Sequence, residues 1–198
     1  MKNKFLVMLL AVSMAAGSVV PVFAEAETEE TAAAEVQEIN FDDITPAYEG
    51  VWIDFEDAFS VYVPEDWTEL DISEEDQENG IFYAIVAPDG SGWNMNVNYT
   101  EIGDQAYTTE QIAQELAAVE SYTDIELLVL NGMEAVSLQT VDNTALIICF
   151  PDEAGGMYTM AITGDVTNAD FTALAGTMGA SVGIYEDDAA DETEAETE

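Results

Sequence analysis

The chain has almost no basic side chains, and this feature constrains its fold more than any other. Its 198 residues include 42 aspartates and glutamates, two lysines, no arginine and no histidine. Both lysines stand at the very start, as Lys2 and Lys4. From residue 25 onward no side chain can form a salt bridge. Any fold must therefore rest on apolar burial and on hydrogen bonds of neutral groups and carboxylates.

The first 24 residues have the pattern of a secretory signal peptide. Lys2 and Lys4 form a positive start, residues 5–16 form an apolar run, and small residues stand at 22 and 24, just before Glu25. A membrane anchor would need about 20 apolar residues, and a glycine, a serine and a proline interrupt the run before that length. We expect cleavage before Glu25 and no membrane span in the remaining chain. The protein is then secreted, extracellular or in the cell envelope, and periplasmic in a Gram-negative cell.

After cleavage the formal charge is −42, because all 42 acidic residues lie beyond position 24. Such a chain cannot neutralise nucleic-acid phosphates, and anionic lipid surfaces repel it. Its field favours cations, either metal ions or the basic surface of a partner. We therefore expect no nucleic-acid partner, and a protein or cell-envelope component with a basic surface fits better.

Composition divides the chain into four parts. Residues 1–24 are the signal peptide and residues 25–45, rich in Glu, Ala and Thr, are predicted to be an acidic disordered linker. Residues 46–185 are the size of one domain, and residues 186–198 form an acidic tail predicted to be disordered. Cys149 has no partner cysteine, and its apolar surroundings predict a buried thiol in a strand.

Strands dominate the predicted domain. Trp93 to Thr100 alternates strictly between large apolar residues and asparagine or threonine, the period of a strand. Thr108 and Gln111 form a capping-box pattern that opens a helix, and a second helix is predicted over 168–182. The order of elements predicts an α+β fold, a twisted antiparallel sheet with helices packed on it. The other predicted strands are 51–55, 59–63, 81–87, 126–130, 134–141, 144–150 and 157–163, and 74–79 is predicted to be a polar loop.

Two short segments carry a family resemblance. The stretch Phe59–Trp67, FSVYVPEDW, resembles the opening strand of PsbP-like proteins, which ends in Pro-x-x-Trp. Leu130–Ala135, LNGMEA, resembles their turn into the central meander, and the helix from 170 to 181 sits where theirs does. This family includes the extrinsic PsbP proteins of photosystem II, the Ran-binding Mog proteins and exported bacterial domains. The resemblance spans about residues 55–184.

The resemblance implies a PsbP-like fold and a non-enzymatic module that docks on a partner or stabilises an assembly. Plant-type members dock through basic residues and bind metal through histidine, and neither has a counterpart in this chain. The resemblance therefore implies no functional residue.

Composition also limits the chemistry. Without His, Lys or Arg from residue 25 onward, the cleaved chain cannot form a Ser-His-Asp triad, a Schiff base or a histidine metal site. We expect no enzyme and no cofactor beyond weak binding of Ca²⁺, which prefers oxygen ligands. The acidic clusters 42–43, 74–76 and 186–188 are the calcium candidates, although none has the spacing of a calcium loop. A hydrolase that uses two carboxylates is a less favoured alternative.

A polar sheet face is the remaining candidate site. Asn94, Asn96 and Asn98, which we call the asparagine row, should share one face of their strand. Polar residues on neighbouring predicted strands alternate in the same way. Such a face could bind a partner or a glycan through amides and hydroxyls, or simply face water. The favoured function is thus a secreted binding or assembly module, and the alternative is an acidic protein that weakly binds divalent cations at the cell exterior. The candidate partner-binding residues are Asn94, Asn96, Asn98, Ser137, Gln139 and Thr159, with Thr163 beside them.

Overall fold

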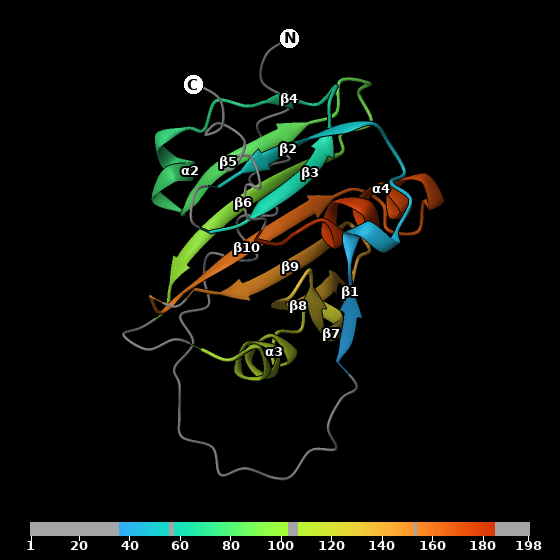
Figure 1. Ribbon diagram of the computed structural model, residues 1–198. Helices are drawn as coiled ribbons and strands as arrows, with labels where there is room; N and C mark the ends of the chain where they lie inside the picture. The colour runs from blue at the N-terminus through green and yellow to red at the C-terminus, as the bar shows by residue number, and fades with distance from the viewer. Residues whose placement is uncertain (1–35, 56–57, 103–106, 153, 185–198) are drawn as a thin grey trace, which may run out of the picture.

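A computed structural model describes residues 36–55, 58–102, 107–152 and 154–184 of the chain (Figure 1). Its main element is an eight-stranded sheet in the order β1-β7-β8-β9-β10-β6-β5-β4. All neighbours in this sheet are antiparallel except β1, which pairs with β7 in parallel. The strands are β1 Gln37–Ile39, β4 Thr68–Glu69, β5 Ile81–Val86, β6 Asn94–Glu101, β7 Tyr122–Leu130, β8 Met133–Thr140, β9 Ala145–Pro151 and β10 Gly156–Thr163.

One face of this sheet, the hairpin face, is covered by a second sheet and a helix. The second sheet is the antiparallel hairpin of β2 (Gly50–Asp54) and β3 (Ser60–Pro64), and the helix is α4 (Ala169–Ala180). Figure 1 shows both packed on the main sheet. Between them lies the larger hydrophobic core, whose fully buried members include Phe59, Phe150 and Phe171.

The opposite face, the asparagine face, carries a smaller core beneath α3 (Thr109–Ala117). The capping box predicted for this helix is present, with the Thr108 hydroxyl accepting from the Gln111 N–H and the Gln111 amide accepting from the Thr108 N–H. Ile112 is buried against strands β8 to β10. The helix therefore covers this face over β7, β8 and β9.

The predicted α+β class is confirmed, and the structure adds four elements, which are β1, η1, α2 and β4. β1 and the short 3-10 helix η1 (Phe41–Asp43) lie within 25–45, so residues 37–43 belong to the folded domain and not to a linker. α2 (Glu74–Glu78) replaces the polar loop predicted over 74–79. Its cap is Ser73, whose hydroxyl accepts from the Asp76 N–H at 3.2 Å. The predicted signal peptide, the remainder of the predicted linker at 25–35 and the predicted acidic tail at 186–198 lie outside the described residues.

The turn between β7 and β8 joins both ends of the described chain. Asn131 and Gly132 both have positive φ, 49° and 85°, which is the requirement of a two-residue hairpin turn. The Asn131 N–H donates to the Ile39 carbonyl at 2.9 Å.

No helix among the described residues is long and apolar enough to cross a membrane.

Candidate functional site

The predicted asparagine row is formed on β6. Asn94, Asn96 and Asn98 share one face, and Met95 and Val97 enter the core on the other. On β10, Thr159 lies directly beside Asn98, and Thr163 lies beside Asn94. Four of the six predicted binding residues are therefore neighbours, with Thr163 at the end of the row.

Ser137 and Gln139 do not join this row, so their predicted grouping is wrong. They pair with Ile148 and Leu146 of β9, whose side chains pack in the core of the hairpin face. The register runs from Asn98 through Thr159 and Cys149 to Val136, so Val136 holds the place expected for Ser137. A shift of one residue reverses the face of every side chain in a strand, and the sequence of β8 alone does not define its register.

The asparagine row is also more buried than a wet sheet face. Asn94, Asn96 and Asn98 are 4%, 3% and 7% exposed. The Oδ1 atoms of Asn94 and Asn98 are buried without a hydrogen-bond partner, as is the Thr163 hydroxyl. Unpaired buried acceptors usually cost about 1–3 kcal/mol each. The binding role of this row stays a prediction.

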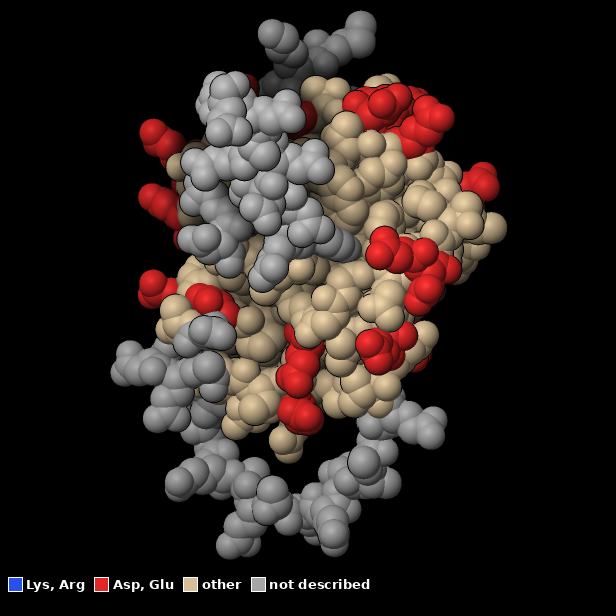
Figure 2. All heavy atoms as spheres, viewed as in Figure 1, with Lys and Arg blue, Asp and Glu red and all other residues tan. Residues whose placement is uncertain are grey.

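The acidic side chains are spread over the surface. Figure 2 shows them scattered across the face in view. Asp42 and Asp43 lie in η1, and Glu74 to Asp76 lie in α2, while 186–188 are outside the described part of the chain. Within the described residues, no group of three or more metal-ligating side chains could hold a metal ion. Asp76 is used in capping instead, since its Oδ2 accepts from the Ser73 hydroxyl at 2.6 Å.

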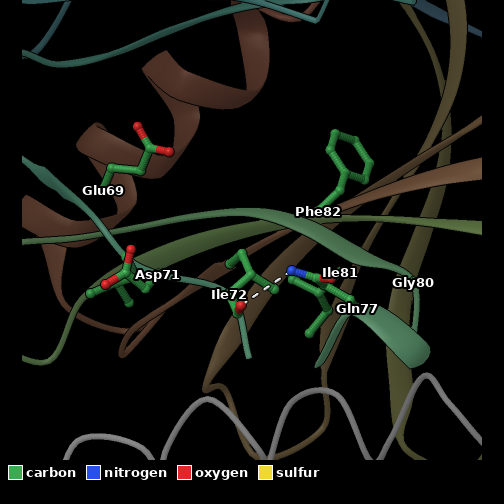
Figure 3. A pocket seen from close by; sticks show the side chains of 8 residues that line it. Glu69, Asp71, Ile72, Gln77, Gly80, Ile81 and Phe82 are labelled. Atoms are coloured by element: carbon green, nitrogen blue, oxygen red, sulfur yellow. Dashed lines mark hydrogen bonds between the residues drawn. The ribbon is translucent and has the colours of Figure 1, made fainter. Parts of the chain in front are cut away.

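A shallow hollow of about 540 Å³ lies between β4, α2 and β5 (Figure 3). Glu69 and Asp71 line it, and the Gln77 side-chain amide donates to the Ile72 carbonyl at 3.3 Å at its edge. Both carboxylates are exposed to solvent (Figure 3).

Cys149 is buried in β9, as predicted, and its sulfur lies 3.7 Å from the Thr159 hydroxyl. Burial raises the pKa of its thiol to about 12, and the contact with Thr159 opposes this only partly. The thiolate, which is the nucleophilic form, is therefore disfavoured.

An aromatic cluster on the outside of the β2–β3 hairpin was not expected from the sequence. We call it the hairpin cluster and define it as Phe41, Tyr48, Trp52 and Tyr62. Tyr62 lies at its centre, with ring centroids 5.5, 5.5 and 5.4 Å from those of Phe41, Tyr48 and Trp52. Trp52 and Tyr62 are cross-strand partners, which aligns their rings on one face of the hairpin.

Hydrogen bonds hold the hairpin cluster in place. The Tyr48 hydroxyl donates to the Tyr62 carbonyl at 2.6 Å, and the Gly50 N–H donates to the Tyr62 hydroxyl at 2.7 Å. The Tyr62 N–H donates to the Ser181 hydroxyl at 2.8 Å. Burial, and then the neighbouring Tyr62, raise the pKa of Tyr48 well above its usual value, so its hydroxyl stays a donor. Gly50 is required here because a Cβ would lie 2.9 Å from the Tyr62 ring and closer still to the Val63 carbonyl.

Comparisons with known proteins address the fold. No protein-family model and no curated protein matches the chain. Among solved structures, it is similar to cyanobacterial PsbP (CyanoP) from Synechocystis sp. PCC 6803, with a TM-score of 0.49 and 16% identity over 67% of this chain and 89% of that one. PsbP-like proteins are also the family that the segment Phe59–Trp67 resembles.

A second similar structure comes from Bacteroides thetaiotaomicron VPI-5482. The TM-score is 0.38 and the identity 17%, over 65% of this chain and 45% of that protein. Similarities at this level concern the fold alone. The function is therefore inferred from the residues of this chain.

Proposed function

We propose that this protein is an exported, non-enzymatic binding module that recognises a partner with a basic surface. The partner is a protein or a cell-envelope component. The observation that carries the proposal is the charge of the described domain, in which every charged side chain is a carboxylate. Such a surface attracts a basic partner from a distance and repels nucleic acid and anionic lipid.

Export is proposed from the signal pattern of residues 1–24. The non-enzymatic role is supported by the chemistry of the chain from residue 25 onward, which offers neither a basic side chain nor an accessible reactive thiol.

Weak association with calcium is a second proposal, and the spread of carboxylates over the surface favours it (Figure 2). Separate carboxylates attract divalent ions without forming a defined coordination sphere. Calorimetry distinguishes the two modes. Diffuse association gives weak heats that do not saturate, whereas a built site gives a saturable heat and a rise in melting temperature beyond that of sodium at equal ionic strength.

The binding function is tested by capture from cell-envelope extract. The chain from Glu25 onward is immobilised, and beads that carry polyglutamate of matched charge serve as the control. We expect a basic protein or envelope component that is retained by the folded chain, lost at high salt, and not retained by polyglutamate. Equal capture on both beads, or no capture at any salt concentration, would contradict the proposal.

A further inference from the structure

Resting on the proposed function, we infer that the hairpin cluster is the docking surface for the partner, and that it receives a lysine or arginine side chain of a protein. The inference joins three properties of one place in the fold, which are exposed aromatic area, rigidity and negative charge.

Exposed aromatic area is the first property. Trp52 is 44% exposed although it packs against Phe41 and Tyr62. Tryptophan and tyrosine are the residues most often found at the energetic centres of protein interfaces. The large core of this domain lies on the other side of the hairpin, so the outward ring of Trp52 is not needed to fill it.

Rigidity is the second property. Three segments converge on the cluster, namely η1, the hairpin and the C-terminal end of α4, which is distant in sequence from the other two. The Phe41 N–H donates to the Asn131 side chain at 2.7 Å, and the Ala47 N–H donates to the Thr177 hydroxyl at 3.1 Å. A surface fixed in this way loses little conformational entropy when a partner binds.

Negative charge is the third property, and it selects the partner. The cluster residues are flanked in the chain by Asp42, Asp43, Glu49 and Asp54, all of them exposed. Asp54 lies on the same face of β2 as Trp52. Aromatic faces attract cations through their quadrupole, with Trp the strongest, and the carboxylates add to this attraction. No described residue carries a positive charge that could compete for the site.

An NMR titration tests the inference. The probe is a short blocked peptide that alternates glycine and arginine, and the control peptide has citrulline, the uncharged analogue, in place of arginine. We expect the arginine peptide to shift backbone resonances at 41–43, 48–54 and 62, and the citrulline peptide to shift few. Shifts scattered over all acidic surfaces would overturn the inference. So would equal shifts with citrulline or with an uncharged oligosaccharide, which would point to a neutral or glycan ligand.

Matched variants separate the site from general charge. Trp52→Ala should weaken binding of the arginine peptide by about five-fold or more, whereas Phe82→Ala, which removes a ring of similar exposure (42%) elsewhere, should not. Asp42→Asn/Asp54→Asn should weaken it more than Glu115→Gln/Glu120→Gln, which removes the same charge near α3. Equal losses within either pair would overturn the inference. Melting curves of each variant confirm that it folds.

The partner captured from envelope extract distinguishes a failure of the proposed docking surface from a failure of the proposed binding function. A partner that binds wild type and Trp52→Ala equally well would overturn the docking surface and leave the binding function standing. Failure to capture a basic partner with wild type would contradict the binding function itself.

Discussion

The Asn131 side chain connects three segments of the structure. Its amide nitrogen donates to the carbonyls of Ala180 and Val182 at 2.9 and 2.8 Å, and its amide oxygen accepts from the Phe41 N–H at 2.7 Å. It thereby joins the β7–β8 turn to η1 and to the end of α4. Both segments support the hairpin cluster, so this one residue links the fold to the proposed docking surface.

Asn131→Ala should lower the free energy of unfolding by about 2–4 kcal/mol, because it removes three hydrogen bonds and places alanine at a positive φ. Asn131→Gly removes the same hydrogen bonds but tolerates the φ, so it should recover about 1 kcal/mol of that loss. Urea unfolding measures both. Equal stabilities for the two variants would show that backbone conformation has no part in the effect.

Cys149 gives a prediction about pH. The unfolded thiol ionises near its ordinary value of 9.0, and the folded thiol near 12. Since the folded pKa is the higher one, the contribution of Cys149 to stability is complete below about pH 9 and declines as the pH rises toward 12. Urea unfolding across this range should show that decline, and a smaller one in Cys149→Ala. Labelling of the native thiol by iodoacetamide at pH 8 faster than global unfolding would contradict the buried assignment.

At the scale of elements, the cap of α3 is the most direct test of the smaller core. Thr108→Ala removes the side-chain acceptor for the Gln111 N–H and should cost about 1 kcal/mol. Thr108→Ser keeps the hydroxyl and should cost much less. Thermal unfolding of the two variants measures the difference, and an alanine variant as stable as wild type would show that the capping box contributes nothing in solution.

The elements predicted most clearly from the sequence are those with a strong local signal, either a regular alternation of side chains or a capping pattern. The alternation along β6 and the capping box of α3 identified both elements, because side-chain direction and capping are local properties. β1 has three residues and β4 two, too few to show a period. β1 also takes its place from pairing with β7, about 90 residues away in the chain.

The candidate site was harder to predict for the same reason. The face of Ser137 depends on its register with β9, which is set by tertiary packing. The hairpin cluster joins Phe41, assigned by composition to the linker, with Trp52 and Tyr62 of two strands. No spacing within one segment could have indicated that these rings meet.

At the scale of the whole molecule, the stability of the folded domain should depend on salt, because all its charged side chains are carboxylates. Carboxylates repel one another more strongly in the compact state than in the unfolded chain, and salt screens this repulsion over about 10 Å at 0.1 M and 3 Å at 1 M. We expect sodium chloride to stabilise the domain by about 1 kcal/mol or more, a rise of a few degrees in melting temperature. A melting temperature independent of salt would show that the carboxylates are too far apart to interact.

The central claim is that a folded surface, and not charge alone, recognises a basic partner. Competition on the captured complex tests it most directly, with polyglutamate of matched charge and free chain each added as competitor. The account predicts that free chain displaces the partner at concentrations at least ten-fold or so lower than polyglutamate, because aromatic contacts add to the shared electrostatic attraction. Displacement by polyglutamate at the same concentration as by free chain would contradict it and leave the protein as a soluble polyanion.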